Sequence, residues 1–176
     1  MATIYCSKKF GDFLGKEKFA ASDNLIKSEL GDWNGHLFYY RRKKYLMFFN
    51  NKTYYGLLFP PLKKADLQDF ENVFLQRLLN QLICDKVISR TETLVILQKM
   101  LPLILFRTNN DKKAIGTLNE FIFQFKVQFD HFGWDNQEIS TINSKLNDTL
   151  VGAGGQKQGD YSRPIENMKA LIDAFT

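Results

Sequence analysis

The 176-residue sequence holds only two cysteines and two histidines, and none of the four lies at the spacing of a metal-binding or redox motif. Cys6 and Cys84 form no C-x-x-C pair, and a chain of this length needs no disulfide to hold its core together. Because apolar residues flank both cysteines, we expect two buried, reduced thiols. A zinc site would need distant carboxylates, so we expect no metal and no cofactor.

Long apolar runs and signature motifs of enzymes are also lacking. Runs such as Leu103–Phe106 are too short to cross a membrane, and the first residues lack the basic-then-apolar order of a signal peptide. We therefore expect a cytoplasmic protein. There is no G-x-S-x-G motif, and in the segment that starts at Gly152 the third glycine of a dinucleotide fingerprint is replaced by Lys157. These absences favour a binding protein over an enzyme, and we assign no catalytic residue.

Aromatic rings and an uneven charge distribution are what the sequence has in excess. It contains 16 Phe, 7 Tyr and 2 Trp. Residues 1–64 carry 12 Lys or Arg against 5 Asp or Glu, whereas residues 65–176 carry 12 against 14. Phenylalanines such as Phe125 and Phe129 follow helical periodicity and indicate a core, whereas five tyrosines crowd the basic region (Tyr39, Tyr40, Tyr45, Tyr54 and Tyr55).

The pattern of apolar residues predicts an α+β fold with a mainly antiparallel sheet. A short strand opens the chain, residues 34–59 read as a three-strand meander, and residues 103–108 read as one later strand. A helical turn is expected over Lys8–Leu14, and several amphipathic helices are expected to pack on this sheet, among them one from Asp66 to about Cys84. A capping box at Ser89–Glu92 should start the next helix.

Three segments are expected from the composition along the chain. Residues 1–151 should form a single α+β domain, residues 152–160 a Gly-rich linker or loop, and residues 161–176 a last helix with Ser162 as its cap.

Four consecutive cations, Arg41 to Lys44, are the strongest chemical feature. At a hairpin tip beside Tyr39 they could contact phosphates and stack on bases. The alternative is a charged strand edge that prevents aggregation. Asn34 and His36 lie on the preceding strand, where His36 is either a phosphate contact or a hydrogen-bonded structural residue. Arg107 closes an apolar strand and would bind either a carboxylate of the chain or an external anion. The candidate ligand-binding residues are thus Asn34, His36, Tyr39, Arg41, Arg42, Lys43, Lys44 and Arg107.

Several short segments occur in the order seen in one family. They are Cys6-Ser7-Lys8-Lys9, Trp33 to Leu37, Arg41-Arg42-Lys43, Phe49 to Thr53 and Gly116 to Asn119. Over roughly residues 1–135 the sequence resembles the bacterial domain-of-unknown-function family 6933. That resemblance implies a small bacterial protein and supplies no activity or site residue.

The sequence therefore leaves two main functions open, with an enzyme that uses His36 together with Arg41 and Asn34 as a third, less favoured hypothesis. The first is a small cytosolic binding protein that contacts nucleic acid or a phosphate-bearing ligand through its basic, Tyr-rich sheet region. The second is a protein interaction or regulatory module that acts as a homo-oligomer or on a partner protein. Neither reading involves a membrane.

Overall fold

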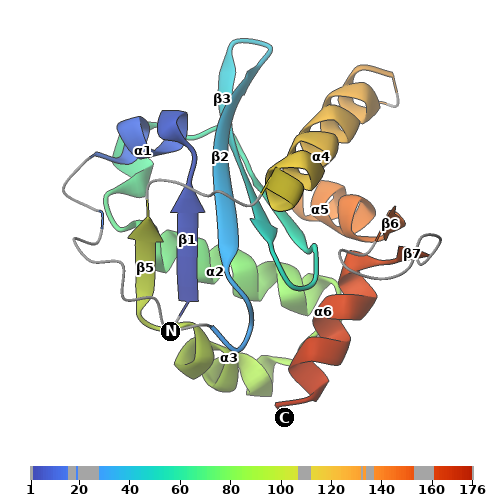
Figure 1. The fold of residues 1–176 in the computed structure, drawn as a ribbon. Coiled ribbons are helices and arrows are strands. Elements are labelled where there is room, and N and C mark those ends of the chain that lie inside the picture. Colours follow the sequence, from blue (N-terminus) through green and yellow to red (C-terminus); the bar gives the residue numbers. More distant parts are fainter. Residues whose placement is uncertain are drawn as a thin grey trace.

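A five-stranded sheet runs through the computed structural model, which describes residues 2–15, 19, 28–106, 112–131, 133, 137–152 and 161–175 (Figure 1). The fold is α+β, as predicted. The strands lie in the order β4-β3-β2-β1-β5. Their bounds are β1 Ala2–Cys6, β2 Trp33–Tyr40, β3 Lys43–Asn50, β4 Gly56–Phe59 and β5 Leu103–Phe106.

The sheet is mixed, so the prediction of a mainly antiparallel sheet was wrong in this detail. β2, β3 and β4 form the predicted antiparallel meander, but β1 runs parallel to both of its neighbours, β2 and β5. Parallel pairing needs a long crossover between the strands, whereas a short turn forces antiparallel pairing. Long segments separate β1 from β2 and β4 from β5, so only the meander could be deduced from turns.

The β2–β3 hairpin turns more tightly than the four basic residues suggested. Arg41 and Arg42 alone form the turn, with φ angles of 44° and 63°. Two consecutive positive φ angles are the conformation of the two-residue turn that matches the twist of a hairpin. Lys43 and Lys44 therefore already belong to β3 and pair with Tyr40 and Tyr39.

Alternation along the strands divides the apolar residues between two cores. On one face, Trp33 and Leu37 of β2 pack with α1 (Lys8–Leu14), α2 (Phe70–Cys84), α3 (Thr93–Met100) and α6 (Pro164–Asp173). On the other face, the sheet packs against α4 (Lys112–His131) and α5 (Ile139–Asn147). Figure 1 shows α2 behind the sheet and α4 in front of it.

The ends of three helices differ in detail from the prediction. α2 begins at Phe70 because Asp69, rather than Asp66, accepts a hydrogen bond from a backbone N–H of the first turn, and a 3-10 turn (η2, Lys64–Leu67) precedes it. The Ser89–Glu92 capping box is present and leads through a 3-10 turn (η3, Arg90–Glu92) into α3. The last helix starts at Pro164, because the residues before it form strand β7 (Tyr161–Ser162), which pairs with β6 (Val151–Gly152).

The two cysteines have different environments. Cys6 is buried in the first core, where burial raises the pKa of its thiol well above the ordinary value. Cys84 is exposed, so the prediction of two buried thiols was wrong for this residue. It is the last residue of α2 and lies off the apolar stripe of that helix, which Leu78 and Leu82 continue into the core.

The edge of β4 is closed by two asparagines of α5. Asn143 Oδ1 accepts from the Leu58 N–H at 2.7 Å, and its Nδ2 donates to the Leu58 carbonyl at 3.0 Å. One helical turn later, Asn147 makes the same pair of bonds with Gly56, at 2.7 and 2.9 Å. The next outward-facing residue of β4 would be Pro60, which has no N–H to satisfy. Two side-chain amides thus take the place of a neighbouring strand.

No helix in the described part of the chain combines the length and the apolar character that a bilayer crossing requires.

Candidate functional site

The tip of the β2–β3 hairpin is tied to the end of α4. Arg41 Nη2 lies 2.9 Å from Asp130 Oδ1, and the Tyr40 hydroxyl donates to the same carboxylate. The Arg41 guanidinium also lies over the Phe129 ring, 5.3 Å from its centre. The hydrogen bonds from Tyr40 and Arg41 hold the pKa of Asp130 below its usual value. Arg41 therefore already has an anionic partner within the protein.

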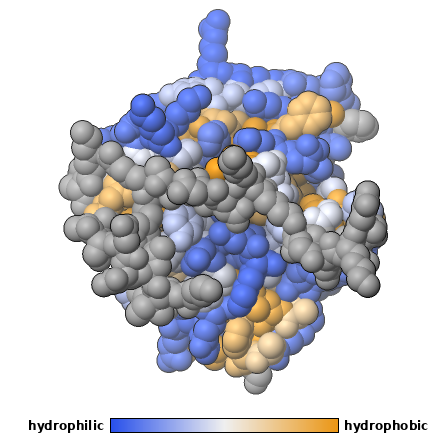
Figure 2. Space-filling model, in the orientation of Figure 1, coloured by the Kyte–Doolittle hydropathy of each residue, from blue (hydrophilic) through white to orange (hydrophobic). Residues whose placement is uncertain are grey.

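The other predicted tip residues point in different directions. Tyr39 is 56% exposed, and Arg42 and Lys43 are also exposed. Lys44 lies on the opposite face from Arg41, with its ammonium 4.7 Å from the centre of the Phe13 ring. The four consecutive cations therefore form no single patch, although hydrophilic residues do project from the top of the molecule, where Figure 1 places the hairpin tip (Figure 2).

The meander tyrosines are mostly packed inside the protein. Tyr45, Tyr54 and Tyr55 are 4%, 7% and 0% exposed. Tyr40 is half-buried and packs against the rings of Phe125 and Phe129. These rings serve as core, and Tyr39 is the one member of the group with an exposed ring.

A row of polar residues lies on one face of β2, and it contains two of the predicted residues. Asp32 comes just before the strand, and Asn34 and His36 follow at steps of two, so all three side chains lie on the α4 side of the sheet. Thr3 and Tyr5 of β1 lie beside this row, because Tyr5 pairs with Asn34. The second core takes none of its members from β1 or from the described side chains of β5, so this part of the face lies outside that apolar core.

The upper end of the row is positively charged. The Ser7 N–H donates to the Gly35 carbonyl at 2.9 Å, which places the start of α1 beside the residue before His36, and the charge of Lys9 acts on the His36 imidazole. From the other side, Lys126 of α4 holds its ammonium 5.8 Å from the centre of the Phe38 ring, two residues beyond His36. Burial lowers the pKa of His36, and the charges of Lys9 and Lys126 lower it further.

No described carboxylate compensates these charges. Within the described ranges, neither Lys9 nor Lys126 forms an ion pair, and no acidic group contributes to the pKa of His36. A half-buried imidazole that feels the charges of two ammonium groups, neither in a described ion pair, is an electrostatic environment that attracts an anion.

The lower end of the row presents hydrogen-bond acceptors. Thr3 and the Ser28 N–H donate to the Asp32 carboxylate, but burial outweighs these bonds and raises its pKa. One oxygen of Asp32, Oδ1, has no donor among the described residues. The same is true of Asn34 Oδ1, whereas Asn34 Nδ2 donates to Asn51. Asn34 is only 4% exposed, so its unpaired carbonyl is a buried group that needs an explanation.

Sequence reasoning found two members of this row and missed the others. It selected Asn34 and His36, but not Asp32, Lys9 or Lys126. Polar residues at 32, 34 and 36, which alternate with Trp33, Gly35 and Leu37, are the signal that could have revealed the row. The lysines carry no such signal, because they come from two helices. Arg107 lies outside the described residues.

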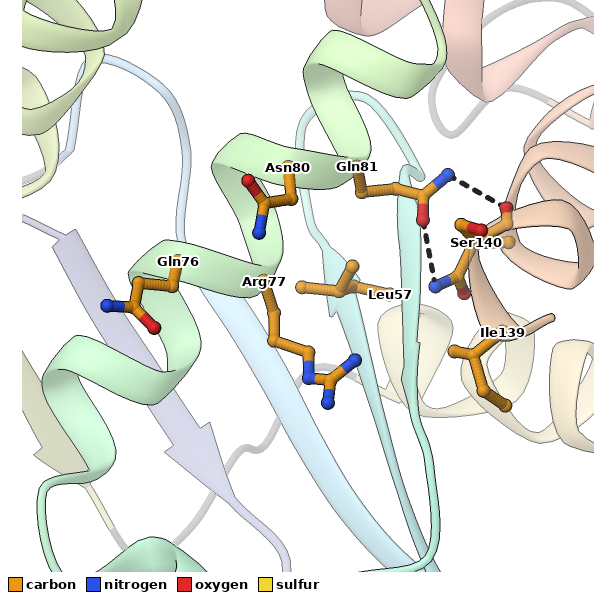
Figure 3. Close-up of a pocket in the computed structure, with 8 residues that line it drawn as sticks. Leu57, Gln76, Arg77, Asn80, Gln81, Ile139 and Ser140 are labelled. Atoms are coloured by element: carbon orange, nitrogen blue, oxygen red, sulfur yellow. Dashed lines mark hydrogen bonds between the residues drawn. The ribbon is translucent and has the colours of Figure 1, made fainter.

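A separate pocket of about 280 Å³ opens between α2, α5 and β4 (Figure 3). It lies at the β4 edge of the sheet, beside the Asn143–Leu58 contact, whereas the polar row lies on β2. Its lining consists of Leu57, Gln76, Arg77, Asn80, Gln81, Ile139, Ser140 and Asn143. Arg77 extends into the space between Leu57 and Ile139 in Figure 3.

Comparison with known proteins identifies one relationship. The family model described as "Domain of unknown function (DUF6933)" matches residues 3–167, which extends the resemblance seen in the sequence into α6. No curated protein and no solved structure matches the chain. The matched range includes both the polar row of β2 and the pocket beside β4.

Proposed function

The chain belongs to the DUF6933 family of unknown function, and from its own geometry we propose that it binds a phosphate-bearing ligand on the face of its sheet. The phosphate would lie at His36, between Lys9 and Lys126. The observation that supports this most directly is the group of three basic side chains from β2, α1 and α4 without a described carboxylate among them. The positive charges in such a group repel one another, and a bound anion would relieve this repulsion.

The position of this group in the sheet supports the same proposal. β1 ends at Cys6, directly beside Gly35, and β1 runs parallel to both of its neighbours. In sheets with parallel strands, ligands bind beyond the carboxyl ends of those strands, where the chain leaves in different directions. His36 and Lys9 lie at that end of β1.

The unpaired acceptors of Asp32 and Asn34 indicate what the rest of the ligand would carry. A buried acceptor without a donor costs about 1–3 kcal/mol, which a ligand hydroxyl or amino group would recover. Residues two apart on a strand lie about 6.6–6.8 Å from each other, so the donor to Asn34 would lie about that far from a phosphate at His36, and the donor to Asp32 about twice as far. A nucleotide carries hydroxyl and amino donors over such a range of distances from its phosphate, which a small phosphorylated sugar does not span. An extended single strand is less favoured, because most meander tyrosines are buried and unavailable for stacking.

Titration with inorganic pyrophosphate and with a nucleoside monophosphate tests this proposal. Lys9→Gln and Lys126→Gln should each weaken binding several-fold and reduce its salt dependence. The matched controls are Lys64→Gln and Lys86→Gln, which remove exposed charges elsewhere. Equal affinity in all four variants would contradict the proposal.

Binding of single-stranded DNA distinguishes the proposed site on the sheet face from a binding site at the hairpin tip. Arg42→Gln combined with Lys43→Gln removes two exposed tip charges without touching His36. If an oligonucleotide binds and only this double variant abolishes it, the tip is a nucleic-acid contact and the proposed site on the sheet face is wrong.

A protein partner is the second candidate, and an apolar patch supports it. Leu94 of α3 is 69% exposed and Leu101, just after α3, is 39% exposed. In Figure 2 an apolar patch lies at the lower edge of the molecule, where Figure 1 places the end of α6 beside α3. Light scattering over a range of concentrations tests self-association, which Leu94→Gln should abolish. A monomer at every concentration would exclude the homo-oligomer.

A further inference from the structure

We propose that the pocket between α2, α5 and β4 is a second binding site, specific for a small carboxylate that carries an apolar group. This site is independent of the proposed phosphate site. Its residues Arg77, Asn80 and Ile139 are not used by the polar row of β2. The proposal is based on three features of the pocket: an arginine without an anionic partner, a rigid polar wall and an apolar floor.

Arg77 supplies the positive charge. Its guanidinium lies 5.7 Å from the centre of the Phe59 ring, which orients the side chain at the pocket. Within the described part of the chain it forms no ion pair and no hydrogen bond. Arg77 is an exposed residue at the mouth of the pocket, and the burial of part of its guanidinium lowers its pKa with no contribution from a carboxylate. All five guanidinium N–H donors are therefore left for water or for a ligand.

The wall opposite Arg77 is held in place by its own hydrogen bonds. Gln81 Nε2 donates to Asp85 at 2.9 Å and to the Ser140 carbonyl at 3.0 Å. Gln81 Oε1 accepts from Asn143 Nδ2 at 3.2 Å (Figure 3). Asn143 is in turn fixed by both backbone groups of Leu58. Because these amides already have partners, they shape the pocket but offer Arg77 no acceptor.

Two further amides lie at the rim and are not used in this way. Gln76 and Asn80 lie on exposed positions of α2, one residue before and three residues after Arg77. Each side-chain NH₂ group can donate to an oxygen held by the guanidinium. Leu57 and Ile139 provide the apolar surface next to these donors.

This combination fits a monocarboxylate better than a phosphate. The planar guanidinium fork matches the two oxygens of a carboxylate in a bidentate pair. One cation balances one negative charge, whereas a phosphate dianion would leave a charge uncompensated beside Leu57 and Ile139. A volume of about 280 Å³ accommodates a carboxylate together with a small ring or a short alkyl chain.

Calorimetric titration with benzoate, and with its neutral isostere benzamide, tests the site on the complete chain. We expect benzoate to bind with a Kd of about 1 mM or tighter and benzamide at least tenfold more weakly. Arg77→Gln should weaken benzoate about 10- to 100-fold, the usual effect of losing hydrogen bonds to a charged group. Arg77→Lys keeps the charge but loses the fork and should give an intermediate affinity.

The control is Arg90→Gln, which removes an exposed arginine outside the pocket and should leave benzoate affinity unchanged. NMR of the side-chain amides shows whether the signals of Asn80 and Gln76 move on titration and those of distant amides do not. The proposal is overturned if benzoate does not bind, if benzamide binds equally well, or if Arg77→Gln binds benzoate as the native protein does. None of these outcomes depends on the phosphate site.

Discussion

Replacing Asn147 with alanine should destabilise the protein far more than the loss of one polar side chain usually does. Asn147 is fully buried and makes two hydrogen bonds to the edge of β4, one from the Gly56 N–H at 2.7 Å and one to the Gly56 carbonyl at 2.9 Å. In the alanine variant both backbone groups stay buried behind α5 without a partner. Each such group costs about 1–3 kcal/mol, so the free energy of unfolding should fall by roughly 2–6 kcal/mol.

Urea denaturation, followed by circular dichroism, measures this difference. The matched control is Asn80→Ala, which replaces an asparagine on an exposed helical position and should change stability by no more than about 0.5 kcal/mol. Asn147→Asp tests the two hydrogen bonds individually, because an ionised carboxylate still accepts from the Gly56 N–H but cannot donate to the Gly56 carbonyl. That variant should be strongly destabilised at neutral pH and should recover part of the loss once the carboxyl group is protonated.

A loss below about 1 kcal/mol in Asn147→Ala would refute the reasoning. It would mean that water reaches the edge of β4, or that α5 shifts, and that the two amides are not essential to the edge.

Three further predictions concern the polar row of β2 and its opposite face. Burial raises the pKa of Asp32, so ionising its carboxyl group lowers the stability of the folded protein as pH rises above the ordinary aspartate pKa near 4. Relative to the native protein, Asp32→Asn should therefore become more stable between about pH 4 and pH 7. Urea denaturation at pH 7 that shows Asp32→Asn to be less stable than the native protein would contradict this. Since the pKa of His36 is lowered, sulfate affinity should rise only as pH falls below about 6.5, and this dependence should disappear in His36→Gln when measured by calorimetry. Gly35→Ala should cost about 1–3 kcal/mol, because the new methyl group would lie 2.8 Å from ring atoms of Phe10 and of Phe48. An unchanged melting temperature would contradict this close approach of the two rings to Gly35.

The elements with local signals could be predicted from the sequence. The meander from 34 to 59 was found because turn residues separate its apolar runs, and the capping box at Ser89 marked the start of α3. The partners of β1 could not be found in this way. Its five residues are compatible with parallel or antiparallel pairing on either side, and the choice depends on crossovers whose path no local pattern encodes.

The candidate site was predictable in part for a similar reason. Asn34 and His36 stand out as polar residues in an aromatic strand, but their surroundings depend on which helices reach them. Lys126 approaches the row only because α4 packs on the same face. The asparagines of α5 were missed as well, because an amide on a helix gives no hint that its partner is a strand edge some 85 residues away in the sequence.

The position of β1 between two later strands also sets an order of events during synthesis. Ala2 pairs with Leu103 and Cys6 with Gly35, so β1 leaves the ribosome before both of its partners and cannot complete its hydrogen bonds until β5 has been made. The β2–β4 hairpins close over short distances and can form well before that. In the interval, the apolar side of β1, with Ile4 and Cys6, has only β2 beside it. Contacts between such distant residues form slowly, and an open strand edge can meanwhile pair with another chain. The nascent protein is thus most exposed to aggregation while α2 and α3 are being made.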